Sequence, residues 1–80
     1  MANNKVKSWE RRQSESEQAW QAFRIYRDGN DERSQARVVA GLGKSRTLIE
    51  RWTKRHDWSA RVLEYDRWWN MERLKALVQG

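Results

Sequence analysis

The sequence predicts an all-α fold, a compact helical domain of about four helices. The chain has no proline and only four glycines, so few of its residues interrupt a helix. Apolar residues recur at spacings of three and four in successive segments, as they do on one face of a helix. No segment alternates between apolar and polar residues for long enough to indicate a strand.

The first helix is predicted to begin at Ser14, which forms a capping box with Glu17. Gly29 can supply the left-handed residue that ends this helix. Between these limits one apolar face is expected to consist of Ala19, Trp20, Phe23 and Tyr26.

A short second helix is predicted to begin after Asp31 or Ser34 and to break at the glycines of residues 41–43. The residues expected to face the core from this helix are Val38, Val39 and Leu42.

The third helix is predicted to begin with Ser45 as its N-cap and to end near His56. Ile49 and Trp52 are three residues apart, so both are expected to face the core.

The fourth helix is predicted to start with Asp57 as its cap and to carry two apolar stripes. Trp58, Val62, Tyr65 and Trp69 form the first stripe, which can close over the core. Beyond Asn70 the apolar residues lie nearly opposite, so either the helix bends there or the second set meets another surface. Residues 71–80 are therefore interpreted as a C-terminal extension, frayed or self-associating, or as the start of an oligomerisation segment. The second set is Met71, Leu74, Leu77 and Val78.

Eighty residues allow one small domain. Disulfides and a clustered metal site are excluded as stabilisers, because the chain has no cysteine and one histidine. Six tryptophans are expected to supply the core in their place. Residues 1–13 are predicted to be a disordered lead-in and residues 14–70 the folded domain. The longest apolar runs are three residues, so no membrane span or signal peptide is expected, and a cytoplasmic location follows.

The positive charge is concentrated in the middle of the chain. Residues 33–61 contain eight basic and two acidic side chains, whereas the rest of the chain contains nine of each. Such focusing indicates a polyanion partner, of which nucleic acid is the commonest for a small domain. The alternative is a solvated basic face without a partner.

Residues 35–54 match a helix-turn-helix pattern, in which a glycine turn and a capping serine separate two short helices. Val39 and Lys44 depart from the general pattern, which prefers a small residue and an aliphatic residue at these two positions.

A helical wheel of the third helix places Thr47, Arg51 and Lys54 opposite Ile49, at about 100° to 200°. This face can enter a major groove, where Arg51 offers a bidentate contact to guanine and Thr47 a methyl contact to thymine. Glu50 either accepts from cytosine or pairs with Lys54. Flanking cations are expected to bind phosphates. The predicted DNA-binding set is Arg37, Lys44, Ser45, Arg46, Thr47, Glu50, Arg51, Lys54 and Arg55.

The stretch from Glu17 to Asp66 resembles short bacteriophage and prophage helix-turn-helix proteins, many of them similar to the N-terminal DNA-binding domain of the small terminase subunit. The most specific part of the likeness is residues 43–52, Gly-Lys-Ser-Arg-Thr-Leu-Ile-Glu-Arg-Trp. The resemblance implies recognition of a phage packaging site, oligomerisation through a later region, and handover of DNA to the large ATPase subunit. It implies neither nuclease nor ATPase activity for this chain.

Other chemistry is not supported by the sequence. Residues 41–45 echo a phosphate-binding loop but lack its first glycine and a preceding strand. His56 has no partner ligand, so it is interpreted as a packed or capping imidazole. The chain is too small to enclose a pocket that would perturb carboxylates such as Glu64 and Asp66. No enzyme activity, cofactor or metal is therefore expected.

The charge and the helix-turn-helix pattern thus predict sequence-specific binding of double-stranded DNA, and the resemblance implies a role as a small terminase subunit in a bacterial host cell. Its partners would be DNA, the large terminase subunit and further copies of the chain, without a membrane. A phage-type transcriptional regulator or excision factor is the alternative within DNA binding. A protein-interaction adaptor with an acidic partner is the alternative outside it.

Overall fold

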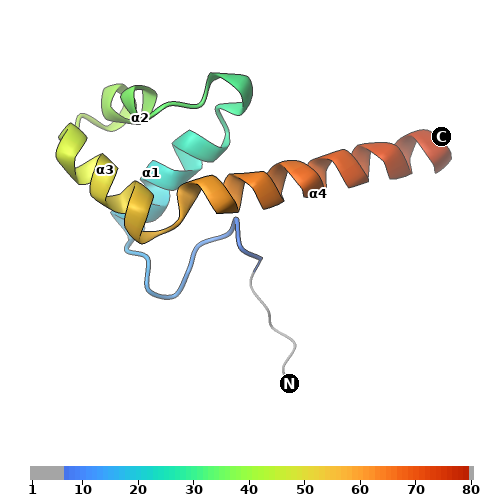
Figure 1. The fold of residues 1–80 in the computed structure, drawn as a ribbon, viewed down its shortest axis with the longest axis horizontal. Helices are drawn as coiled ribbons and strands as arrows, with labels where there is room; N and C mark the ends of the chain where they lie inside the picture. The colour runs from blue at the N-terminus through green and yellow to red at the C-terminus, as the bar shows by residue number, and fades with distance from the viewer. Residues whose placement is uncertain (1–6, 80) are drawn as a thin grey trace.

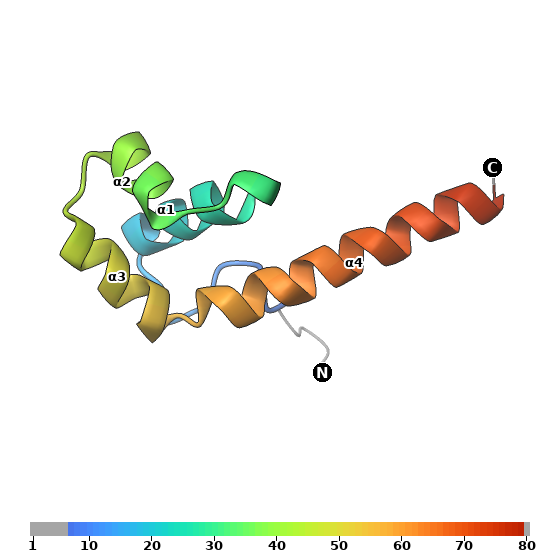
Figure 2. The same ribbon diagram turned by 45° about the horizontal axis from the view of Figure 1, so that its top comes forward.

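The computed structural model describes residues 7–79, and it confirms the all-helical class. The elements are α1 (Glu17–Arg27), the 3-10 helix η1 (Asn30–Glu32), α2 (Gln35–Leu42), α3 (Arg46–Arg55) and α4 (Trp58–Gln79). Residues 7–79 contain no strand. The first three α-helices gather around the beginning of α4, and the remainder of α4 extends away from them (Figures 1 and 2).

A single core joins the four α-helices. Each of them contributes at least one fully buried side chain, including Phe23 from α1, Val38 from α2, Ile49 from α3 and Trp58 from α4. The Trp58 ring is the centre of this arrangement, since its centroid lies 5.8 Å from that of Phe23 and 5.0 Å from that of Tyr26. Of the six tryptophans expected in the core, Trp58 is fully buried, whereas Trp69 is 45% exposed. Trp9, Trp20 and Trp52 are partly buried and pack against the core, so the prediction holds in part.

Both predicted ends of α1 are wrong. The N-cap is Ser16, whose side chain accepts a hydrogen bond from the amide of Ala19. Ser14 lies instead in a turn in which the Glu15 amide donates to the Arg12 carbonyl at 3.0 Å, and the Glu15 side chain is directed to a buried partner. At the other end Gly29 is right-handed (φ −75°), and the left-handed residue is Asn30 (φ 53°).

The inward partner of Glu15 is Arg61 of α4, and this pair is almost fully buried. The Arg61 side chain is 1% exposed and that of Glu15 0%. Two guanidinium nitrogens donate to the two carboxylate oxygens at 2.8 and 3.0 Å. The Arg61 guanidinium also donates hydrogen bonds to three backbone carbonyls, those of Ser8, Glu10 and His56. The guanidinium also lies over the Phe23 ring, 3.8 Å from its centroid.

The predicted disordered lead-in of residues 1–13 differs from the structure over residues 7–13, while residues 1–6 lie outside the described part. Trp9 packs against Tyr65 and Trp68 of α4, with ring centroids 6.1 and 5.7 Å apart. Arg27 donates a hydrogen bond to the carbonyl of Trp9 at 3.0 Å. The segment has no apolar run, so its order comes from one tryptophan and from backbone contacts with arginines.

α4 is continuous through Asn70, so the bend considered from the sequence is absent. Asp57 precedes the helix as predicted, but with a left-handed backbone (φ 51°), and its carboxylate lies 3.4 Å from the Arg12 guanidinium. Trp58 and Val62 of the first stripe are buried, whereas Trp69 is 45% exposed because α4 has by then left the core. Within residues 7–79, every helix is too short or too polar to cross a bilayer.

Loss of Glu15 is expected to destabilise the domain severely. Glu15→Ala leaves the Arg61 guanidinium buried without its counter-charge, a change that costs about 3–5 kcal/mol. Glu17→Ala is the control, because the partners of Glu17 are exposed: it pairs with Arg11 and accepts a hydrogen bond from the Gln21 side chain, and about 1 kcal/mol or less is expected for an exposed pair. Urea denaturation followed by tryptophan fluorescence measures both. Equal effects of the two substitutions would contradict a structural role for the buried pair.

The stability of the fold is expected to decrease on acidification in two stages. Burial lowers the pKa of His56 below 6.5, so an unfolded chain takes up this proton first and stability falls as pH drops below 6.5. Burial alone would raise the pKa of Glu15, but hydrogen bonds from Arg61 and the Arg12 amide hold it below 4.5. Its contribution is present above pH 4.5 and is lost as pH falls through the lowered value.

Thermal melts from pH 8 to pH 3 measure this profile. His56→Gln is expected to flatten the melting temperature in the upper stage and to retain the lower stage. An unchanged upper slope in that variant would show that other groups cause it.

Candidate nucleic-acid interface

The connection between α2 and α3 is defined by two capping serines and one glycine. Ser34 and Ser45 are the N-caps of α2 and α3, and their hydroxyls accept from the amides of Arg37 and Leu48 at 3.1 and 3.2 Å. Gly43 ends α2 in a left-handed conformation (φ 68°). The second of the two predicted starts of α2 is therefore correct, and so are the glycine turn and the serine cap of α3.

The inner side of α3 is attached to the rest of the domain. Ile49 is fully buried, and Trp52 packs, partly buried, against the core. The Thr53 hydroxyl donates to the backbone carbonyl of Ile49 at 2.8 Å and accepts from the side-chain amide of Gln35 in α2 at 3.3 Å. These contacts fix the rotation of α3 about its own axis, and they therefore determine which residues face outward.

The outer side of α3 is exposed and carries the side chains that the helical wheel placed there. They are Thr47, Glu50, Arg51 and Lys54, and Arg55, which was predicted to flank this face, is exposed beside them. Within residues 7–79, Arg51, Lys54 and Arg55 make no ion pair, and neither does Lys44 in the connection. Arg51, Lys54 and Arg55 are exposed and Lys44 is partly exposed, so no carboxylate of the described residues neutralises these four cations.

Two other cations of the predicted set have carboxylate partners. Arg46 pairs with Glu50 one turn later at 3.4 Å, so the predicted pairing of Glu50 with Lys54 is wrong. Glu50 is four residues from both Arg46 and Lys54, so its carboxylate could pair with either of them, and in the structure it pairs with Arg46. Arg37 pairs with Glu32 at 2.9 Å. Both pairs are largely exposed, so each contributes under about 1 kcal/mol and can exchange its carboxylate for a phosphate.

The basic segment defined from the sequence also contains cations that are structural. Arg61 is buried, and Arg33 forms a bidentate pair with Asp66 at 2.8 and 2.9 Å. The Arg33 guanidinium holds the pKa of the Asp66 carboxyl below its usual range. Charge counting along the sequence could not separate these inward cations from the outward ones, since their partners are 33 and 46 residues away.

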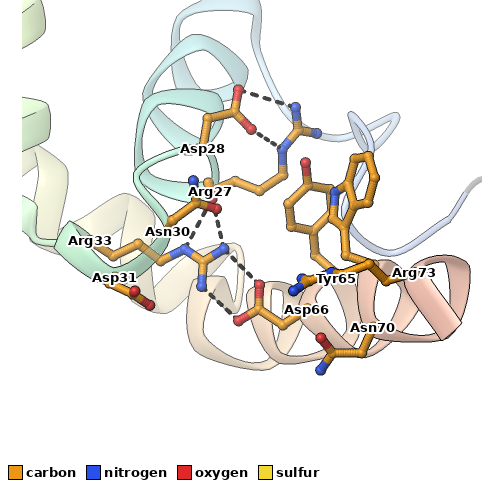
Figure 3. Close-up of a pocket in the computed structure, with 10 residues that line it drawn as sticks. Arg27, Asp28, Asn30, Asp31, Arg33, Tyr65, Asp66, Asn70 and Arg73 are labelled. Carbon is orange, nitrogen blue, oxygen red and sulfur yellow. Dashed lines mark hydrogen bonds and ion pairs between the residues drawn. The ribbon is translucent and has the colours of Figure 1, made fainter. Parts of the chain in front are cut away.

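A hollow of about 930 Å³ lies between η1 and α4, away from α3. Figure 3 shows that two ion pairs cross or border it, Arg33 with Asp66 and Arg27 with Asp28. The carboxylates of Asp66 and Asp28 are already bound by guanidinium groups. The Arg33–Asp66 pair connects the end of η1 to α4 beside this hollow, so we interpret the hollow as part of the helix packing. Its other lining residues are Asn30, Asp31, Tyr65, Trp69, Asn70 and Arg73.

His56 is buried at the C-cap of α3, and its carbonyl accepts from Arg61 at 3.2 Å. The packed interpretation of this imidazole is confirmed. In the part of the chain that the structure describes, no group of three or more histidine, cysteine, aspartate or glutamate residues is arranged to hold a metal ion.

Comparisons of the chain with protein-family models, with curated proteins and with solved structures find no match.

The left-handed turn at Gly43 is expected to be required for the placement of α3. Gly43→Ala meets no atom within 4 Å but forces a left-handed alanine, which costs about 1–2 kcal/mol. Gly41→Ala is the matched control. Gly41 lies inside α2, and the added Cβ would meet Cδ1 of Ile25 in α1 at 3.5 Å, an ordinary van der Waals contact. Alanine is favoured over glycine within a helix, so this variant is expected to be more stable by about 0.5–1 kcal/mol. Urea denaturation should give opposite signs, and the same sign for both would contradict the assignment of the turn.

Proposed function

We propose that the chain binds double-stranded DNA sequence-specifically, with α2 and α3 acting as a helix-turn-helix and the outer side of α3 entering the major groove. One observation carries the proposal. Lys44, Arg51, Lys54 and Arg55 lie on or beside one helix face and make no ion pair within residues 7–79. Unpaired cations on a helix that the core holds rigidly suit a partner with regularly spaced negative charge.

The positions on α3 divide into base-reading and phosphate-binding groups. Arg51 and Thr47 project from the centre of the outer side, where Arg51 can donate two hydrogen bonds to guanine. Lys54 can reach a base or a phosphate. Lys44, Arg46, Arg55 and Arg37 flank this centre and would bind phosphates, which sets the register of the helix on the duplex. Ser45 Oγ, although it caps α3, retains a hydroxyl proton for a phosphate oxygen.

Within DNA binding, the resemblance of residues 17–66 to small terminase subunits supports recognition of a phage packaging site in the cytoplasm of a bacterial host. The large terminase subunit would then be a partner. A transcriptional regulator or excision factor would use the same α3 surface. Gel shifts with mapped fragments of the parent genome separate the two roles, because they give the position of the preferred site.

The alternative from another class is an adaptor whose basic surface binds an acidic protein. Titrations of duplex DNA at several salt concentrations discriminate, because release of counterions makes the logarithm of the DNA affinity fall linearly with the logarithm of salt. No DNA binding at low salt would reject the proposal.

Arg51→Ala is expected to weaken binding to the preferred site by about 1–3 kcal/mol and to reduce the preference over unrelated duplexes. Arg55→Ala is expected to weaken all duplexes alike and to reduce the salt slope by about one. Fluorescence anisotropy with a selected and a scrambled duplex measures both quantities.

Lys75→Ala is the control for the loss of one positive charge, because Lys75 is exposed, pairs only with Glu72 one turn earlier within the described residues, and lies near the C-terminal end of α4. It should leave both affinities nearly unchanged. If Lys75→Ala matched Arg51→Ala on both duplexes, the effect of Arg51 would be one of net charge, and α3 would not be the reading element.

A further inference from the structure

The side of α4 that faces away from the core carries a regular stripe of exposed residues. Leu63 is 53% exposed, Leu74 55% and Leu77 75%. Spacings of three and four alternate along this stripe, which is the seam pattern of a two-stranded coiled coil. The six seam positions, all exposed, are Ala60, Leu63, Arg67, Asn70, Leu74 and Leu77.

The seam is longer than the part of α4 that extends beyond the core. Ala60 and Leu63 lie in the first turns of α4. Their neighbours in the sequence, Trp58 and Val62, are on the opposite side of the helix and are buried in the core. A frayed tail would account for exposure beyond Asn70 only. A frayed tail does not account for the exposed apolar residues Ala60 and Leu63, which lie in the part of α4 that packs on the core.

We propose that this seam pairs with the same seam of a second copy of the chain, with the two helices antiparallel. In the register that centres the pair between residues 68 and 69, Leu63 of each copy lies opposite Leu74 of the other. Ala60 then lies opposite Leu77, and Arg67 opposite Asn70. Every apolar position of the seam then lies opposite an apolar position, and every polar position opposite a polar one. Each of these contacts occurs twice, because the two copies are related by a two-fold axis.

The charges on the seam favour the antiparallel orientation. In a parallel pair, like seam positions face each other, so Arg67 would be placed against its own copy. In the antiparallel pair the two Arg67 side chains are separated, and each faces the neutral amide of Asn70. Asp66 and Arg73 border the seam on one edge, and the antiparallel register brings Asp66 of each copy beside Arg73 of the other. Asp66 has about half of its side chain exposed, so it can accept this second cation.

The extended half of α4 also gains stability from a partner. Residues 71–79 are helical, yet Met71, Leu74, Leu77 and Val78 are all more than half exposed. A helical segment without tertiary contacts is marginal in water. Pairing would cover Leu74 and Leu77 directly and Met71 and Val78 at the edge of the seam.

Sedimentation equilibrium of the full chain without DNA tests the pairing, so the outcome is independent of the proposed function. The expected result is a monomer–dimer equilibrium at concentrations up to about 100 µM. Leu74→Glu should raise the dissociation constant at least tenfold. Ala76→Glu is the matched control, since it places the same carboxylate on the opposite side of α4, and it should leave the constant within twofold. A monomer throughout, or equal effects of the two variants, would overturn the proposal.

The orientation is tested by disulfide cross-linking, which is clean because the natural chain has no cysteine. Leu63→Cys and Leu74→Cys are prepared as single variants, distinguished by a mass tag, then mixed and oxidised. An antiparallel pair gives the mixed cross-link in preference to either homodimer. Preferential Leu63→Cys homodimers would show a parallel pair, and higher oligomers that persist in Leu74→Glu would show association through another surface. Either outcome would reject the antiparallel seam.

Discussion

The buried pair of Arg61 and Glu15 is the interaction on which the rest of the structure depends. A guanidinium in the interior of a small domain is tolerated only when its charge and its hydrogen-bond donors are all satisfied. Satisfying Arg61 brings together the segment before α1, the turn that starts α1, the end of α3 and the first turns of α4. One side chain thus links four parts of the chain that are far apart in sequence. Because the His56 carbonyl is among its acceptors, the same network fixes the end of α3 and with it the direction of the proposed DNA-reading surface.

The structure divides the positive charge of the chain between two tasks. Arg61 and Arg33 point inward and hold elements together, Arg61 through Glu15 and Arg33 through Asp66, which joins η1 to α4. The cations around α3 point outward, and several have no carboxylate near them. A net charge computed along the sequence sums both groups, so it overstates the size of the outward patch while still locating it. What makes the patch suitable for a polyanion is that Lys44, Arg51, Lys54 and Arg55 make no ion pair within residues 7–79, although Glu50 shares their face and pairs with Arg46. Only the fold reveals these pairings.

Local rules predicted local features, and long-range contacts caused the errors. The turn at Gly43 and the Ser45 cap depend on neighbours within four residues, and the outward residues of α3 follow from helical periodicity around Ile49, so the sequence was sufficient for them. The start of α1 was wrong because Glu15 bonds to a residue 46 positions away, and no pattern around Ser14 reports that contact. The order of residues 7–13 was missed for the same reason, since Trp9 packs against α4. The candidate surface was therefore more predictable than the interior that supports it.

The two stripes of α4 give this helix a double role that follows from its length. A helix of 22 residues is about 33 Å long, which exceeds what a core made of three short helices can cover. Its first stripe ends where the core ends, near Trp69, and the seam continues on the opposite side from Ala60 onward. Since α3 joins α4 through a short buried corner at His56, a second copy held against the seam would carry its own α3 in a fixed position. Two linked sets of outward cations would then act at a high effective concentration on one polyanion, which raises affinity without any new contact.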